Sequence, residues 1–331
     1  MRHLLRRILF YCIALWASVT LNFFIPRMAP GNPAQAMMLR FERQGHLAPE
    51  TAKALQAAFG LNNSDPLYIQ YFKYLGDLLH GQLGISLTNY PTPVKDVIGQ
   101  GIEWTIILGA IAVLVSFGLG CLLGVVMAWK RGSFVDTFLA PATTFLASIP
   151  YFWLALLIVY VFGYTLGWFP FSDGFDTRLD IGWTFDFIGS ALYHGILPAL
   201  TIVLSSVSGW LLVMRNSMIT TLSEDYVLMA SAKGLHTRRV MLAYAARNAI
   251  LPNVAGFALS LGTIVGGQLL TEIVFSYPGI GYTLLQAVQG QDYALVQGVF
   301  LIIALAVLGA NFLADLLYTM LDPRVRQERS A

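Results

Sequence analysis

The residues of this chain that could do chemistry are few, and their spacing fits no common catalytic site. No His-Glu-x-x-His pair of a metalloprotease is present, and no Gly-x-x-x-x-Gly-Lys-Ser/Thr phosphate loop occurs. The sequence therefore predicts a protein that is not an enzyme, with no catalytic residues, no metal site and no cofactor of its own. The five histidines are scattered over loops and one terminus: His3, His46, His80, His194 and His236.

Four carboxylates in one short segment are the remaining candidate for cation binding. Their spacing matches no calcium-binding loop, so a solvated acidic loop is the favoured interpretation. The four residues are Asp173, Asp176, Asp180 and Asp186.

The composition is that of a membrane protein. Of 331 residues, 56% are hydrophobic and only 11% are charged, whereas soluble domains are about 25% charged. The net charge of +2 is too small to suggest a nucleic-acid partner. Cys12 and Cys121 both lie in apolar runs, where they are expected to pack rather than to form a disulfide.

Six apolar runs reach the length of about 20 residues that a transmembrane helix needs. The first follows three arginines and resembles a signal peptide, but its length and the lack of a cleavage site predict a retained helix. The sequence thus predicts an all-α membrane protein of six transmembrane helices, with a large extracytoplasmic loop after the first. The runs are 8–26, 104–129, 137–165, 196–214, 253–275 and 294–318.

The positive charges predict that both termini are cytoplasmic. With that orientation, 13 of the 20 Lys and Arg residues face the cytoplasm. Six of the other seven lie in the long first outer loop, where the positive-inside rule has little force. The expected divisions are 1–29 for the N-terminal segment and first span, 30–103 for the outer loop, 104–323 for the core with a cytoplasmic loop at 215–252, and 324–331 for the tail.

The outer loop is expected to contain two helices. One runs from Pro49 to about Gly60, and the other covers 66–79, where apolar residues recur at helical spacing. The loop is either a cap on the membrane core or a docking surface for an external protein.

Within the spans, small residues and prolines carry the main signals. Gly120 with Gly124, and Gly262 with Gly266, form Gly-x-x-x-Gly patterns that allow close helix packing. Pro141 and Pro150 predict a kink or break in the third span.

Ionisable pairs are missing from the spans, where Glu272 and Asp315 lie near span ends. Proton- or sodium-driven carriers need such residues as relays, so the energy is expected to come from a partner.

The segment Tyr226–Pro252 lies between two of the apolar runs, on the predicted cytoplasmic side. A slim helix with Ala230 and Ala232 is expected to end at Lys233, with Gly234 in the left-handed position. A helix this short is marginal alone, so it should rest against something. From the small residues alone, an ordinary amphipathic connector is the favoured interpretation, and the wider pattern of motifs reverses this.

An ordered series of motifs resembles the peptide/nickel (dipeptide/oligopeptide) family of ABC importers, and in particular its B-type membrane permease subunit. Asn32 replaces the usual Asp, and Tyr244 stands where His is common. The matching residues are Ala29–Pro33, Gly60-Leu61, Pro66-Leu67, Gln70-Tyr71, Gly81–Ser86, Pro93-Val94, Ser148–Pro150, Leu197-Pro198, Arg215, Ser217, Met218, Glu224–Tyr226, Ala230–Gly234, Arg247–Ala249, Pro278–Gly281, Asp292-Tyr293, Asp315–Tyr318 and Asp322–Arg324.

The resemblance implies the type I ABC importer permease fold in a bacterial or archaeal plasma (inner) membrane. It implies a second homologous permease subunit, two cytoplasmic ATPase subunits that bind ATP and Mg, an extracytoplasmic substrate-binding protein and contact with membrane lipid. It also implies that the cytoplasmic loop couples this chain to an ATPase. The implied coupling residues are Glu224, Asp225, Tyr226, Ala230, Ala232, Lys233, Gly234, Arg238 and Arg239.

The substrate is less well defined by the sequence. The resemblance favours di- or oligopeptides, with oligosaccharides as an alternative, whereas nickel is disfavoured because no Met/His-rich lining is visible. No substrate-binding residue can be assigned. The alternative from another class is a stand-alone channel or membrane scaffold that works without an ATPase.

Overall fold

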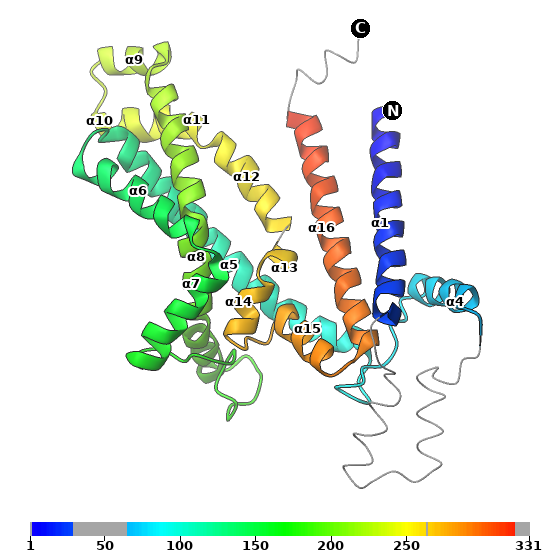
Figure 1. Cartoon of the computed structure of the whole chain (residues 1–331). Helices are drawn as coiled ribbons and strands as arrows, with labels where there is room; N and C mark the ends of the chain where they lie inside the picture. Colours follow the sequence, from blue (N-terminus) through cyan, green and yellow to red (C-terminus); the bar gives the residue numbers. More distant parts are fainter. Residues whose placement is uncertain (1, 29–64, 263, 322–331) are drawn as a thin grey trace. The chain divides into compact units, whose positions relative to one another are not determined.

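The computed structural model describes residues 2–28, 65–262 and 264–321, which are helical with connecting loops (Figure 1). Within these residues the only extended pairing is an isolated bridge between Ile85 and Pro93, which confirms the all-α class. The predicted helix at 49–60, the motif at 29–33 and the tail at 324–331 lie outside the described residues.

The chain divides into two compact units. The first combines residues 1–104 with 279–319, and the second is built mainly from 105–278. The described helices of the first unit are α1 (Arg2–Met28), α4 (Leu67–Leu79), the first part of α5 (Val94–Trp129), α15 (Ile280–Gln289) and most of α16 (Tyr293–Leu321).

In the first unit, side chains of α1 form hydrogen bonds with both α4 and α16. Thr20 Oγ1 and the Tyr71 hydroxyl are 2.7 Å apart, and the Asn22 amide donates to the Gln297 carbonyl at 2.6 Å. Helix α4 confirms the amphipathic helix predicted at 66–79. It packs through aromatic contacts with Phe23, while Phe72 stays 67% exposed.

A single carboxylate organises the loop before α5. Asp292 Oδ2 accepts hydrogen bonds from Ser86 Oγ at 2.6 Å and from the backbone N–H groups of Leu87 and Thr88. Its other oxygen accepts from the Leu295 N–H at 3.0 Å, at the start of α16. Asp292 is fully buried, and these donors satisfy its charge.

The second unit contains the remaining described helices. They are the rest of α5, α6 (Phe134–Ser148), α7 (Tyr151–Ile158), the π-helix η1 (Val159–Thr165), α8 (Phe185–Leu222), α9 (Asp225–Ala232), α10 (Thr237–Arg239), the π-helix η2 (Val240–Ala246), α11 (Arg247–Ala249), α12 (Leu251–Gly262), α13 (Ile264–Gly267) and α14 (Leu269–Val274).

Four described helices are long and apolar enough to cross a membrane, and a bent pair would make five. The four are α1, α5, α8 and α16, which correspond to predicted spans one, two, four and six. The structure therefore supports a multi-span helical protein, whereas the predicted count of six continuous helices is met only in part.

The third predicted span is bent by 98° between α6 and α7. Pro150 lacks a backbone N–H, and it forces Ile149 into an extended conformation with ψ of 127°. The predicted break is confirmed at Pro150, whereas Pro141 lies inside α6 without ending it.

The fifth predicted span consists of the short helices α12, α13 and α14. The described backbone leaves the helical conformation at Gln268, between α13 and α14. Residue 263 lies outside the described residues, so close packing at Gly262 and Gly266 stays a prediction. Glu272 in α14 is fully buried and accepts a hydrogen bond from Thr105 Oγ1 at 2.7 Å. Glu272 lies near the end of the predicted span as expected, but its burial was not predicted.

The other glycine pair brings α5 and α8 into close contact. A Cβ atom at Gly120 would lie 2.5 Å from Trp210 Cβ, and one at Gly124 would lie 2.6 Å from the Leu211 carbonyl oxygen. Only glycine permits this approach, which confirms the packing interpretation of the Gly120–Gly124 pattern.

An ion pair joins the beginning of α6 to α8. The Arg215 guanidinium donates two hydrogen bonds to Asp136, at 2.6 and 3.0 Å. The Gly132 N–H also donates to Asp136, at 3.0 Å. The bidentate geometry fixes the position of α6 along α8.

In the acidic segment before α8, Asp176 is paired with a neighbouring arginine. The Arg178 guanidinium pairs with Asp176 at 2.8 Å and lowers the pKa of that carboxyl to about 2. Within the described ranges, no group of three His, Cys, Asp or Glu side chains is placed to hold a metal ion.

We expect Gly124→Ala to destabilise the protein by about 1–3 kcal/mol, because the added methyl group overpacks the α5–α8 contact. Gly118→Ala is the matched control on α5, since nothing lies within 4 Å of a Cβ atom there. Thermal unfolding of the purified protein in detergent measures the difference. Equal melting temperatures for the two variants would contradict the close packing.

Candidate functional site

The predicted helix in the cytoplasmic loop exists as α9, Asp225–Ala232. It follows a turn in which Ser223 and Glu224 leave α8, and Glu224 is extended at the N-cap position. Asp225 lies in the first turn, where a negative charge is favourable to the helix dipole.

The end of α9 is the Schellman motif that the sequence suggested. Gly234 has φ of +73°, which only glycine adopts at little cost. The Gly234 N–H donates to the Ser231 carbonyl at 3.0 Å, and the Leu235 N–H donates to the Ala230 carbonyl at 3.4 Å. Nothing within this chain lies within 4 Å of a Cβ atom at Gly234, so the constraint inside the chain is backbone conformation alone.

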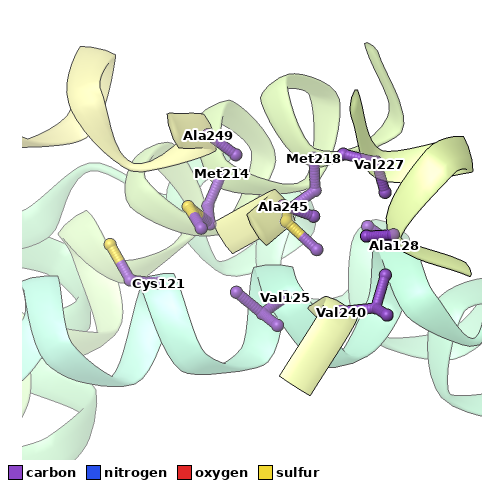
Figure 2. Packing of buried hydrophobic residues seen from close by; sticks show 10 residues of the cluster. Cys121, Val125, Ala128, Met214, Met218, Val227, Val240, Ala245 and Ala249 are labelled. Atoms are coloured by element: carbon purple, nitrogen blue, oxygen red, sulfur yellow. The ribbon is translucent and has the colours of Figure 1, made fainter. Parts of the chain in front are cut away.

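One side of α9 is buried against the ends of α5 and α8 (Figure 2). Val227 is 2% exposed and Ala230 is 3% exposed. Both residues belong to a group of buried side chains from α5, α8, α9, η2 and α11, which we call the buried cluster. Its members are Cys121, Val125, Ala128, Met214, Met218, Val227, Ala230, Val240, Ala245 and Ala249.

The predicted coupling residues divide between two faces. Ala230 belongs to the buried cluster and points away from solvent. The others are exposed and form the outer surface of the loop: Glu224, Asp225, Tyr226, Ala232, Lys233, Gly234, Arg238 and Arg239.

Tyr226 connects α9 to the returning chain. Its hydroxyl accepts a hydrogen bond from the Asn248 side-chain amide at 2.8 Å, across 22 residues of sequence. Asn248 lies in α11, immediately before the chain enters α12. The loop is therefore closed at both ends, by this hydrogen bond and by the buried cluster.

Arg238 and Arg239 occupy the single turn α10, beyond Gly234. The His236 ring accepts a hydrogen bond from the Arg238 N–H at 3.3 Å and so caps that turn. Both arginines are exposed, which leaves a basic edge beside α9.

Two residues of the outer surface were not singled out from the sequence. Leu228 is 56% exposed and Met229 is 59% exposed, although both are apolar. The three-residue spacing of buried Val227 and Ala230 was the available signal, because it places positions 228 and 229 away from the packed face.

Comparison with known proteins places the chain in a family. A family model described as "Binding-protein-dependent transport system inner membrane component" matches residues 120–327. The chain therefore belongs to the family of binding-protein-dependent transport system inner membrane components.

Two relatives extend over nearly the whole chain. The Di/tripeptide transport system permease protein DppB of Pseudomonas aeruginosa (strain UCBPP-PA14) is 35% identical over 322 residues, which cover 93% of this chain and 94% of the relative. The Oligopeptide transport system permease protein AppB of Bacillus subtilis (strain 168) is 30% identical over 323 residues, which cover 98% of each chain.

We expect Gly234→Ala to loosen the end of α9, because alanine disfavours the left-handed conformation by roughly 1 kcal/mol. Local opening would then be roughly fivefold more frequent, as seen by faster amide hydrogen exchange at residues 230–235. Lys233→Ala is the control, since Lys233 has φ of −73°. Unchanged exchange in Gly234→Ala would show that the Schellman motif does not hold the helix end.

Proposed function

We propose that this chain forms half of the translocation pathway of an ATP-driven importer for di- and oligopeptides, and that the outer surface of α9 docks a cytoplasmic ATPase. The main support is the two-sided character of α9. It exposes Leu228 and Met229 on one side, and on the other it buries Val227 and Ala230 in the buried cluster with side chains of α5, α8 and η2.

The outer surface of α9 has the composition of a protein-docking site. The apolar side chains of Leu228 and Met229 are neighbours, and Tyr226, two residues before Leu228, is 39% exposed. Charged residues surround them: Glu224 before the helix, Asp225 in its first turn, and Lys233, Arg238 and Arg239 after it. An apolar centre with a polar rim is typical of interfaces between proteins.

The buried cluster supports coupling rather than simple attachment. Because Val227 and Ala230 share the buried cluster with side chains of α5, α8 and η2, a displacement of α9 would act on the ends of two membrane-length helices. ATP binding and Mg would reside in the partner ATPases, whose closure would push α9 and switch the pathway between inward- and outward-facing forms.

The family and the relatives support the rest of the assembly. Membership of a binding-protein-dependent family supports an external binding protein that delivers substrate and ATPase subunits that supply energy. We propose a second, homologous permease as the other half of the pathway, and two ATPases in the complex. The names of both relatives favour peptides over oligosaccharides and nickel.

The same family supports a place in the bacterial inner membrane. In the proposed orientation both termini and α9 face the cytoplasm. The acidic segment 166–184 and helix α4 then face outward, where the exposed apolar side chains of α4 are available to the binding protein.

We expect Leu228→Glu and Met229→Glu each to abolish recovery of the ATPases, because a carboxylate replaces an apolar contact at the centre of the interface. Ala232→Glu and Gly234→Asp should act similarly at its edge. The measurement is co-purification of the ATPases with this chain, together with substrate-stimulated ATP hydrolysis.

Thr220→Glu is the matched control for this experiment. It adds the same charge at an exposed position on α8, outside the α9 surface. We expect it to retain the ATPases. Full recovery and full stimulation in the four α9 variants would mean that this loop is a plain connector.

We expect cysteines introduced at Asp180 and Thr237 to lie on opposite sides of the membrane. The background would be Cys12→Ser, since Cys12 is exposed while Cys121 is buried. A membrane-impermeant maleimide should label position 180 in intact spheroplasts, and position 237 only after permeabilisation. Labelling of position 237 in intact spheroplasts would reverse the proposed orientation.

A further inference from the structure

A cavity of about 490 Å³ lies in the second unit, where the break between α6 and α7 meets α8, α12, α13 and α14. Its walls come from three of the predicted spans and a residue of a fourth. Of the described residues that line it, none is charged, and the polar ones include Ser205, Ser206, Gln268 and Thr271.

Two of these wall residues have buried polar atoms without a hydrogen-bond partner among the described residues. Gln268 Oε1 and Thr271 Oγ1 make no hydrogen bond to any described residue, and the two residues are 6% and 0% exposed. Buried polar groups are nearly always paired, so each unpaired group needs an explanation. Both residues adjoin the cavity, and an occupant would supply the missing partners once their side chains turn toward it.

The serines of the wall determine which chemistry the occupant must bring. Ser205 and Ser206 both donate their hydroxyl hydrogens to the Ile202 carbonyl, at 2.9 and 2.6 Å. Ser148 donates in the same way to the Thr144 carbonyl, at 2.8 Å. Ser206 Oγ also lies 2.8 Å from Ser116 Oγ, from which it accepts when its own hydrogen goes to Ile202. Because a hydroxyl has one hydrogen and two lone pairs, each serine still retains at least one lone pair as an acceptor.

The wall is therefore an uncharged surface that is rich in acceptors, completed by the unpaired Gln268 Oε1. Transition-metal cations prefer carboxylate, imidazole or thiolate ligands, and none of the described residues that line the cavity carries one. The main chain of a peptide is neutral and carries an N–H donor at nearly every residue. Acceptors that contact these donors would hold peptides of many sequences.

We propose that this cavity is a substrate site in which Gln268, Thr271 and the serines of α8 bind the main-chain amide groups of a passing peptide. This inference rests on the proposed function and adds to it the residues of the pathway. Gln268 Oε1 accepts from a peptide N–H, and Thr271 Oγ1 takes either role with a neighbouring amide. The side chains of the peptide are left without specific partners, which suits a carrier of mixed peptides.

The test compares two substrates in proteoliposomes that contain the complete transporter. One is radiolabelled trialanine, and the other is trialanine with both amide nitrogens methylated, so that the N–H donors are lost. Each is supplied as a preformed complex with the binding protein, so that capture outside the membrane does not limit uptake. The wild-type complex should transport trialanine faster than the methylated analogue.

Gln268→Leu should lower trialanine uptake about tenfold, the effect of one lost hydrogen bond, and should change uptake of the analogue much less. The preference for unmethylated peptide should therefore shrink. Thr271→Val, which keeps the side-chain shape, is the second variant and should also lower trialanine uptake.

The matched control is Thr201→Val. Thr201 is fully buried on α8 and donates to the Leu197 carbonyl at 3.0 Å, but it does not line the cavity. Its uptake rates should equal those of the wild type. Basal ATP hydrolysis and subunit recovery, measured for all variants, separate a defect in substrate handling from a defect in assembly.

The results of this test distinguish a failure of the cavity proposal from a failure of the proposed function. If the wild type transports trialanine but does not prefer it, or if both variants keep the wild-type rates and preference, the cavity is not the amide-binding site and the proposed function stands. If the wild-type complex transports no peptide at all, the proposed function fails and this inference fails with it.

Discussion

Val227 and Ala230 hold α9 against the ends of α5 and α8, and the behaviour of the second unit depends on this contact. A helix of eight residues has too few internal hydrogen bonds to be stable in water. Full burial of a valine side chain contributes roughly 1.5–3 kcal/mol, which is the scale of support that such a helix needs. The helix is therefore ordered because it is packed, and it cannot move far without moving what it packs against.

The same contact explains the small side chains in this region. Ala128, Ala230, Ala245 and Ala249 all lie in the buried cluster, and they let four segments meet at short range. Gly120 and Gly124 continue this close approach along the contact of α5 with α8. The ion pair of Asp136 with Arg215 then adds α6 to the same body. The small residues and the ion pair therefore pack α5, α6, α8 and α9 into one body rather than leaving independent spans.

Features that depend only on neighbouring residues could be predicted from the sequence. The left-handed Gly234, the amphipathic helix α4 and the break at Pro150 each follow from the backbone preferences of a few neighbouring residues. The buried and exposed faces of α9 could not be assigned in the same way, because they depend on where α5 and α8 end. The burial of Glu272 was missed for the same reason, since its partner Thr105 is 167 residues away in sequence.

The fifth predicted span shows that hydropathy alone does not predict whether a helix is continuous. Residues 253–275 are apolar enough to suggest one helix, yet the described backbone is interrupted at Gln268, between α13 and α14. Apolar composition reports burial in lipid or protein, but it does not report continuity of the backbone hydrogen bonds. Interrupted helices at membrane depth are tolerated where the freed backbone is buried in protein or lines a cavity. Gln268 and Thr271 stand in this interrupted region, and both line the cavity.

Helix α8 links the two ends of the proposed mechanism. Met214 and Met218 of α8 belong to the buried cluster that also holds Val227 of α9, and Ser206 lies in the cavity wall eight residues before Met214. At a rise of 1.5 Å per residue this separation is about 12 Å of continuous helix. Helix α6, paired to α8 through Asp136, ends at Ser148 in the same cavity. Helix α12 also reaches the cavity, at Ser260, and it follows α11, whose Ala249 lies in the buried cluster and whose Asn248 donates a hydrogen bond to Tyr226 of α9. In the proposed mechanism, a push on α9 would therefore reach the cavity by two routes, one through α8 and the other through α11 and α12.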